Sequence, residues 1–244
     1  MGKDNGYMQQ SENHPAGIEI ALWQYSSNER DWNRWVLSLS KAERDRAATY
    51  RFEADRASFM AGRYLLRRLL SLSIGTAPAK LVLSPDKDGK LRLEGRDTPQ
   101  FSLANADGLV TVAVAWGCDH VGIDCERIDV EIEEAAVASY CSRDEQRWLA
   151  ELPAGDRAQA AVALWTLKES RLKALGVGLR EDPRNMAFAW KDGVPVMVGD
   201  GDRLWHHRLI ESGSQHVVAL AACCQSGLPA ISTRLFQDDS MPSE

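Results

Sequence analysis

The stretch that decides the fold is LVTVAVAWGCDHVGIDCE, residues 109–126. Its first part, 109–116, is an apolar run interrupted only by Thr111, and a short break at 117–120 separates it from a second apolar run. Two such runs around a short break predict a β-hairpin. Because side chains alternate between the faces of a strand, Asp124 and Glu126 are expected to project to the same side of the second strand.

Two carboxylates held this close repel each other unless a cation or a proton lies between them. Magnesium binds a few carboxylate oxygens and completes its coordination with waters and substrate phosphates, so Asp124 and Glu126 are suited to a magnesium site. The alternative is an exposed strand end that happens to carry two acidic side chains. The pair alone does not decide between the two interpretations.

The segment WTLKESRLK, residues 165–173, lies within a predicted helix over 158–175 that is followed by two glycines. Glu169 and Lys173 are four residues apart and share a face, a spacing that also occurs in ordinary helix-stabilising ion pairs. A carboxylate beside two lysines, Lys168 and Lys173, suits a site that binds a polyanion together with its metal. With the two carboxylates upstream, the segment favours a magnesium site for phosphate chemistry.

The motifs Gly-Ile-Asp-x-Glu at 122–126 and Trp-x-x-Lys-Glu-x-x-x-Lys at 165–173 resemble the paired signature of the 4'-phosphopantetheinyl transferases. The resemblance is to the large pseudodimeric type, which activates surfactin synthetase and other peptide and polyketide synthetases. Further similar segments are the helical region 40–70, a Gly-Lys turn at 89–90 and the segment 101–106. The resemblance therefore covers about residues 18–225.

One departure from the family pattern lies in the segment 101–106. The family has a Phe-Asn-Leu-Ser-His-Ser type segment there, whose Ser-His pair contacts coenzyme A phosphates, whereas this chain has Ala104 and Asn105. Asn105 can donate a hydrogen bond but cannot carry the charge of a protonated histidine. We expect Asn105 to contact the ligand, with coenzyme A binding either weaker or moved onto neighbouring lysines and arginines.

The resemblance implies a role for each matching residue. Magnesium is expected to bind Asp124, Glu126 and Glu169. Glu169 and Lys173 are the expected catalytic residues, the first as acceptor of a serine proton and the second as partner of the reacting phosphate. The expected contacts to coenzyme A are Arg63, Lys90, Asn105, Asp124, Lys168 and Lys173.

Two features keep an alternative open. Glu145 matches a family position for metal binding or base catalysis, but with Ser142 it also fits an N-terminal helix cap. Positive charge gathers in one predicted helical region, where it suits either phosphate binding or a solvated face. The arginines of this region are Arg44, Arg46, Arg51, Arg56, Arg63, Arg67 and Arg68.

The function that the resemblance implies is transfer of the phosphopantetheine arm of coenzyme A to a serine of an apo acyl or peptidyl carrier protein. The reaction would depend on magnesium and release 3',5'-ADP. One alternative is a catalytically silent module that binds coenzyme A or a carrier. Another is a different magnesium-dependent phosphate-transfer enzyme, although the sequence has no Gly-rich phosphate loop.

The predicted fold class is α+β, because a helix-then-strands order occurs twice, at 18–116 and 121–223. The resemblance implies two similar halves that form a pseudodimer, with the active site in the cleft between them. The expected division is a mobile segment 1–16, an N-terminal half 17–118, a C-terminal half 119–236 with the metal site, and a mobile tail 237–244. A single chain would then suffice, so a monomer is expected.

Composition excludes several classes of protein. A net charge of −6 and a pI near 5.5 argue against a nucleic-acid binder. No apolar run approaches the roughly 20 residues of a membrane span, and the polar residues 1–15 resemble no secretory leader, so a cytoplasmic protein is expected. Five cysteines without disulfide or zinc spacing are expected to be reduced thiols.

Overall fold

Helices and strands follow one another in two successive groups along the chain. The computed structural model describes residues 14–25, 29–128, 134–199, 204–213 and 215–237. The first group is β1 (Gly17–Gln24), α1 (Glu29–Ser38), α2 (Lys41–Ala47), α3 (Glu53–Ile74), η1 (Pro78–Lys80), β2 (Leu83–Pro85), β3 (Leu91–Leu93), β4 (Gln100–Ala106) and β5 (Leu109–Trp116). The second is β6 (His120–Arg127), α4 (Glu134–Tyr140), α5 (Arg143–Glu151), α6 (Ala154–Leu175), η2 (Gly178–Arg180), η3 (Pro183–Asn185), β7 (Phe188–Lys191), β8 (Val194–Met197), β9 (Trp205–Ile210), β10 (His216–Cys223) and β11 (Ile231–Gln237).

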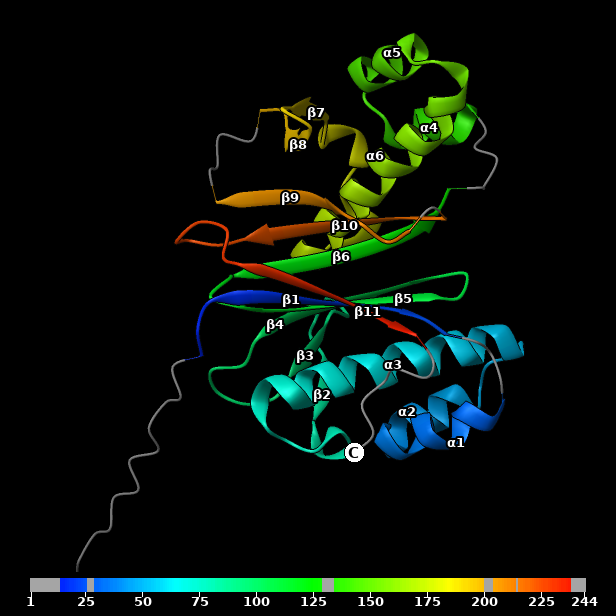
Figure 1. Cartoon of the computed structure of the whole chain (residues 1–244), viewed down its shortest axis with the longest axis vertical. Coiled ribbons are helices and arrows are strands. Elements are labelled where there is room, and N and C mark those ends of the chain that lie inside the picture. The colour runs from blue at the N-terminus through cyan, green and yellow to red at the C-terminus, as the bar shows by residue number, and fades with distance from the viewer. Residues whose placement is uncertain (1–13, 26–28, 129–133, 200–203, 214, 238–244) are drawn as a thin grey trace, which may run out of the picture.

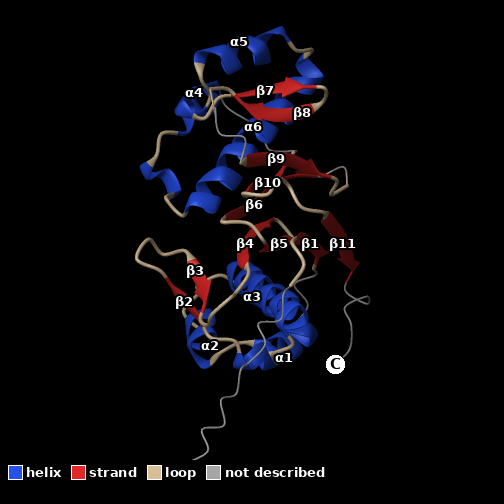
Figure 2. Ribbon diagram, turned by 90° about the vertical axis from the view of Figure 1, so that its left-hand side faces the viewer, coloured by secondary structure: helices blue, strands red, loops and turns tan. Residues whose placement is uncertain are grey.

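Two β-sheets lie face to face in the middle of the molecule, and helices cover the outer face of each (Figures 1 and 2). The first sheet has the strand order β11-β1-β5-β4 and packs against α3, whereas the second has the order β6-β10-β9 and packs against α6. Two short hairpins, β2-β3 and β7-β8, complete the two halves. The prediction of an α+β fold with two helix-backed halves is confirmed.

The surface between the two sheets is a continuous apolar core. Ile20 and Ala113 from the first sheet and Ile123 and Leu220 from the second belong to one cluster and are fully buried. At about 25 cal/mol per Å² of apolar surface, burial of this kind is the main term that holds the halves together. The halves are therefore not independent units joined by a linker, since each sheet supplies one wall of the shared core.

The predicted hairpin between 109–116 and 121–126 is wrong. β5 pairs with β1 on one side and with β4 on the other, so it has no free edge for β6. β6 instead pairs antiparallel with β10 in the facing sheet, and the chain crosses from one sheet to the other at Gly117, whose φ of +74° suits glycine. The largely apolar sequence of β5 reflects burial on both of its faces, which is typical of a central strand.

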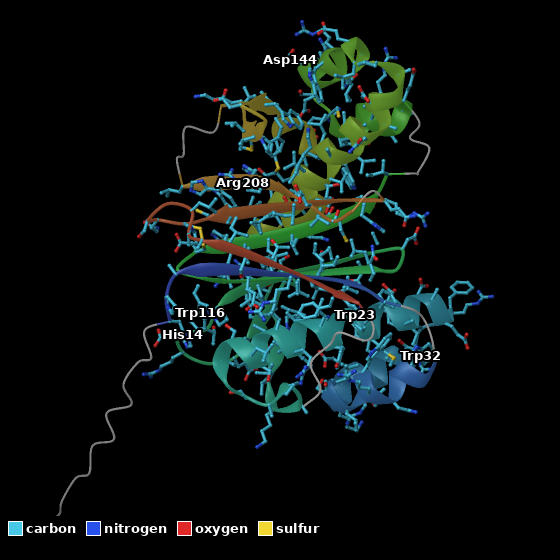
Figure 3. All side chains as sticks on the ribbon, in the orientation of Figure 1. His14, Trp23, Trp32, Trp116, Asp144 and Arg208 are labelled. Carbon is cyan, nitrogen blue, oxygen red and sulfur yellow. A yellow bond between two sulfur atoms is a disulfide. The ribbon has the colours of Figure 1, made fainter. Side chains whose placement is uncertain are left out.

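The strand β11 belongs by sequence to the predicted C-terminal half, 119–236, but pairs with the sheet of the first half. It pairs in parallel with β1, so the last described residues of the chain return to the first sheet rather than ending the second half. Gln237, expected to begin a mobile tail, is the final residue of this strand. The rest of that tail and residues 1–13 lie outside the described residues, while His14 stacks on Trp116 with ring centroids 4.0 Å apart (Figure 3).

The predicted helical region 40–70 contains two helices, α2 and α3. Ser40 and Glu43 form a capping box that starts α2, and the chain reverses before α3 begins at Glu53. The reversal brings α2 alongside α3, where the Oε2 atom of Glu43 accepts a 2.7 Å hydrogen bond from the Nε atom of Arg67. Arg67 also donates to the carbonyl oxygens of Pro78 and Leu81, so this arginine is fully buried and structural.

The expectation of five reduced cysteines is also wrong, because Cys118 and Cys224 form a disulfide. These residues are 106 positions apart in sequence, but Cys118 precedes β6 and Cys224 follows β10. Antiparallel pairing of the two strands places His120 opposite Cys223, which brings the ends of both strands together. Cys125, Cys141 and Cys223 are buried and lie outside this disulfide.

Helix α6 approaches strand β6 very closely at Gly122. A Cβ atom added to this glycine would lie 1.9 Å from the carbonyl oxygen of Ser170 and 2.4 Å from the backbone nitrogen of Ala174. Only glycine fits, because the obstructing atoms belong to the backbone of α6 and cannot rotate away. Gly122 therefore sets the distance at which α6 lies on β6.

Gly122→Ala is expected to lower the free energy of unfolding by at least about 3 kcal/mol, because the added methyl group overlaps the α6 backbone. Urea denaturation would measure the loss. Gly155→Ala is the matched control: it lies in α6 with no atom within 4 Å of its added Cβ, so it is expected to fold at least as stably as the original chain. Equal stability of the two variants would contradict the close packing of α6 on β6.

Reduction of the Cys118–Cys224 disulfide is expected to lower the free energy of unfolding by about 4 kcal/mol, as a loop of this length predicts. Denaturation with and without dithiothreitol would measure the difference. A Cys118→Ala variant should be less stable in oxidising buffer and insensitive to the reductant. If the original chain were also insensitive, the disulfide would not be a stabilising bond of the folded protein.

Candidate functional site

The carboxylates of β6 face helix α6. Gly122, Asp124 and Glu126 are alternate residues of one strand and share a face, and Gly122 is the point at which α6 touches that face. Lys173, one residue before Ala174, donates a 2.6 Å hydrogen bond from its Nζ atom to Oδ1 of Asp124. Glu169 lies one helical turn earlier on α6, so the structure brings both predicted motifs together.

Asp124 is 4% exposed, and the structure gives a hydrogen-bond partner to one of its two carboxylate oxygens. Oδ1 accepts from Lys173, but Oδ2 is buried and has no hydrogen-bond partner among the described residues. Burial raises the pKa of Asp124 despite the opposing effect of the Lys173 ammonium, whose own pKa the Asp124 carboxylate raises against the effect of burial. A buried carboxylate oxygen without a partner costs free energy, so it marks a position where a cation or a hydrogen-bond donor is missing.

Glu126 is oriented by an aromatic side chain. Its Oε1 atom accepts a 3.1 Å hydrogen bond from Nε1 of Trp165, four residues before Glu169 on α6. Burial and the nearby Asp124 carboxylate raise the pKa of Glu126, whereas the indole hydrogen bond lowers it. The sequence analysis missed this role of Trp165, although the spacing of four residues places it on the same helical face as Glu169.

Glu169 differs from the other two carboxylates because no side chain or backbone group among the described residues holds it by a hydrogen bond or ion pair. Burial raises its pKa, and the carboxylates of Asp124 and Glu126 add to the effect while Lys173 opposes it. Glu169 therefore interacts electrostatically with the other two carboxylates, and it is the carboxylate best placed to take a proton.

Within the described residues, no set of three or more His, Cys, Asp or Glu side chains is arranged closely enough to hold a metal as it stands. The chemistry of the donor set nevertheless fits a hard cation, which prefers carboxylate oxygens. The buried Oδ2 of Asp124 has no partner, and Glu126 and Glu169 both have raised pKa values because of burial and neighbouring negative charge. A divalent cation would offset both unfavourable features.

Two cavities adjoin these residues, and each is lined by both halves of the chain. The larger, about 640 Å³, includes Glu126 of β6 and Asn105 of β4 in its lining. The other, about 360 Å³, is lined by Lys173 of α6 together with Lys90 and Arg63 from the first half. Of the predicted site residues, Glu126 and Asn105 thus line the first cavity, and Lys173, Lys90 and Arg63 line the second.

Lys90 connects the two halves at the second cavity. Its Nζ atom donates to the carbonyl oxygens of Val121, at 3.1 Å, and Ala174, at 2.7 Å. Burial, with help from Arg92, lowers the pKa of Lys90 to about 8. An ion pair at 2.8 Å between Arg180 and Asp88 anchors the same turn to the end of α6. Two of the three ammonium hydrogens of Lys90 are therefore engaged, and one remains for a ligand.

Arg63 is better placed for an anion. Its nearest carboxylate oxygen, on Glu43, lies 3.9 Å away, and Glu43 already accepts the short hydrogen bond from Arg67. The Nη1 atom of Arg63 is buried without a hydrogen-bond partner, and the guanidinium lies over the ring of Phe59. A buried cation that is incompletely paired favours an anionic ligand in the adjoining cavity.

Asn105 lies at the first cavity, but its amide is occupied. Nδ2 donates to the carbonyl oxygen of Ser58 at 2.6 Å and to the hydroxyl of the same residue at 2.9 Å. Both amide hydrogens are used, so only the Oδ1 atom of Asn105 remains for a ligand. The positive charge that the family's histidine would supply has no counterpart in this side chain.

The comparison with known proteins agrees with these motifs. The family model described as "4'-phosphopantetheinyl transferase superfamily" matches residues 120–221, which contain β6, α6 and β10. The 4'-phosphopantetheinyl transferase HetI of Nostoc sp. is 30% identical over 168 residues, which cover 66% of this chain and 70% of that protein. The chain belongs to the 4'-phosphopantetheinyl transferase superfamily.

Two further proteins are similar to parts of the chain. The phosphopantetheinyl transferase of Thraustochytrium sp. is 27% identical over 229 residues, 85% of this chain and 79% of that protein. A crystal structure of a holo-(acyl-carrier-protein) synthase from Bacillus anthracis in complex with CoA is 18% identical, with a TM-score of 0.37. The alignment covers 43% of this chain and 96% of that one.

The superfamily motif contains one residue whose predicted role the structure contradicts. Lys168 was expected to contact coenzyme A, but its side chain is 0% exposed. Its Nζ atom donates to the carbonyl oxygens of Tyr140 and Pro183 and, at 2.7 Å, to Oε2 of Glu145. All three ammonium hydrogens are used inside the protein, so Lys168 is a structural residue.

Glu145 is structural as well, which decides the alternative that the sequence left open. It forms a capping box with Ser142, and its Oε1 atom accepts from the backbone nitrogen of Phe188 at 2.8 Å. Its neighbour Asp144 lies on α5 at the outer end of the molecule (Figure 3). The Glu145–Lys168 pair therefore joins α5, α6 and β7 and takes no part in the candidate site.

Lys168→Met is expected to lower the free energy of unfolding by about 3–5 kcal/mol, because it leaves the buried Glu145 carboxylate unpaired. Thermal and urea denaturation would measure the loss, and the exposed Lys191→Met is the matched control. If Lys168→Met left the stability unchanged and weakened coenzyme A binding, Lys168 would be a ligand contact and not a structural residue.

Proposed function

We propose that this protein is a 4'-phosphopantetheinyl transferase that moves the phosphopantetheine arm of coenzyme A to a serine of an apo acyl or peptidyl carrier protein. The observation that carries the proposal is the meeting of Asp124, Glu126, Glu169 and Lys173 on the facing surfaces of β6 and α6. The relatives in the superfamily are named for this transfer. In the proposed reaction, 3',5'-ADP leaves.

The proposed chemistry assigns separate tasks to the residues. The serine oxygen attacks the phosphorus atom next to the pantetheine arm, and the bond from that phosphorus to the bridging oxygen of the diphosphate breaks. Glu169 takes the serine proton, since its carboxylate has no protein partner among the described residues. Lys173 uses one ammonium hydrogen on Asp124 and offers the others to the leaving phosphate.

Magnesium would be held by Asp124, Glu126 and Glu169, where it would offset the charge that develops on the diphosphate. The residues themselves supply the arguments for this assignment, namely the buried Oδ2 of Asp124 and the raised pKa values of Glu126 and Glu169. Lys173 orients the Asp124 carboxylate through its hydrogen bond, and its ammonium opposes the effect of burial on the pKa of Asp124.

Coenzyme A is proposed to lie in the cavity lined by Lys173, Lys90 and Arg63, with its diphosphate toward Lys173. The buried guanidinium of Arg63 would then meet the second anionic group of the ligand, its ribose phosphate. Asn105, tied to Ser58, contributes only its Oδ1 atom from the neighbouring cavity. Asp124 acts on the ligand only through the cation and Lys173.

The proposed partner is a carrier protein in the cytoplasm, where coenzyme A and apo carriers meet, and we propose that a single chain acts as a monomer. Both walls of the cleft come from one chain, which supports action without a second copy. No helix of the described residues is long and apolar enough to cross a membrane.

The direct test is mass spectrometry of an apo carrier protein after incubation with this protein, coenzyme A and magnesium. Transfer adds about 340 Da, the mass of phosphopantetheine, and is expected to disappear when a chelator removes the metal. No mass gain on acyl and peptidyl carriers, with coenzyme A still bound, would favour a silent binding module. Preference for simple nucleoside triphosphates over coenzyme A would favour another phosphate-transfer reaction.

Glu169→Gln is expected to reduce the rate of transfer by about 100-fold or more, because it removes the proton acceptor and a metal ligand together. The same mass assay, sampled over time, measures the rate. Glu151→Gln, an exposed residue at the end of α5, is the matched control and should leave the rate unchanged. Transfer by Glu169→Gln at the original rate would show that this carboxylate is not part of the reaction.

A further inference from the structure

The three carboxylates of the site are not held in the same way. Asp124 is bound by the ammonium of Lys173, and Glu126 is bound by the indole of Trp165, whereas Glu169 has no such partner among the described residues. Lys173 can touch substrate, but Trp165 meets the site only through Glu126. The indole contact therefore calls for an explanation other than catalysis.

The hydrogen bond from Trp165 is directional. An indole N–H can only donate, so it pairs best with an ionised carboxylate and fixes one of its oxygens. The 3.1 Å bond to Oε1 leaves the Oε2 atom of Glu126 for a further ligand. Glu126 also lines the 640 Å³ cavity, so an unrestrained side chain at the end of β6 would have room to rotate away from the site.

A second aromatic ring, that of Tyr140, packs against the indole. The ring of Tyr140, at the end of α4, lies 5.1 Å from the ring of Trp165, and the Tyr140 hydroxyl donates to the carbonyl oxygen of Ala161. The carbonyl oxygen of Tyr140 accepts one of the three hydrogen bonds of the buried Lys168. A continuous series of contacts thus runs from Lys168 through Tyr140 and Trp165 to Glu126.

We infer that Trp165 is a positioning residue: its N–H holds the Glu126 carboxylate in the orientation that binds the cation, and Tyr140 holds the indole in place. The inference rests on the metal site within the proposed function, because it takes Glu126 to be a metal ligand. It also explains why the Trp-x-x-Lys-Glu-x-x-x-Lys motif begins with a tryptophan. Trp165 and Lys168 support the site through their contacts with Glu126 and Tyr140, whereas Glu169 and Lys173 face the reacting groups.

The test is a titration with Mn²⁺, followed by the electron paramagnetic resonance of the free ion, in the presence of coenzyme A and without a carrier. Trp165→Phe keeps the ring and removes the N–H, and is expected to raise the Kd for Mn²⁺ by about 10-fold, as losses of such supporting contacts do. Trp190→Phe is the matched control, since Trp190 stacks on Trp148 away from the carboxylates and should leave the Kd unchanged.

A double-mutant cycle separates positioning from general damage to the fold. In a Glu126→Gln background, Trp165→Phe should have no further effect on Mn²⁺ affinity, because the carboxylate through which Trp165 acts is gone. Thermal denaturation of each variant checks that the fold persists. The inference is overturned if Trp165→Phe binds Mn²⁺ as the original chain does, if it weakens binding equally in both backgrounds, or if the original chain binds no Mn²⁺ at this site.

The outcome is independent of the transfer assay. If no carrier protein gains mass while the Mn²⁺ titrations behave as expected, the proposed function fails and the role of Trp165 stands. If carriers are modified and Trp165→Phe leaves Mn²⁺ affinity unchanged, the inference about Trp165 fails and the proposed function stands.

Discussion

The site depends on the absence of a side chain at residue 122. Because Gly122 has no Cβ atom, the backbone of α6 can approach β6 at Ser170 and Ala174. The approach places Lys173 within 2.6 Å of Asp124 and brings Glu169 close enough for Asp124 and Glu126 to raise its pKa. A side chain at this position would push the helix away from the strand and separate the two motifs.

The electrostatic organisation follows from this packing. Carboxylates that face a helix lose water, and burial raises the pKa of Asp124, Glu126 and Glu169 alike. One ammonium group and one indole N–H offset the cost of burying these carboxylates only in part. What remains is a deficit of positive charge beside a cavity lined by further cations, and a magnesium ion with a bound diphosphate would correct that deficit. The buried Glu145–Lys168 pair, in contrast, is complete and has a structural role.

Local features were predictable from the sequence and long-range ones were not. Alternation placed Asp124 and Glu126 on one face, and the periodicity of 158–175 placed Glu169 and Lys173 together on a helix. The partner of β5, the return of β11 to the first sheet and the Cys118–Cys224 disulfide depend on how distant segments pair, which local patterns do not encode. Lys168 was misassigned for a related reason: a charged residue in a motif looks like a ligand until its burial is known.

The central claim is that the carboxylates of β6 and α6 form the reaction centre for coenzyme A. A crystal structure of the protein with coenzyme A and magnesium tests it most directly. The account predicts a metal bound by Asp124, Glu126 and Glu169, with the diphosphate beside Lys173 and the ribose phosphate near Arg63. Coenzyme A bound at another surface, or a diphosphate remote from these carboxylates, would contradict it.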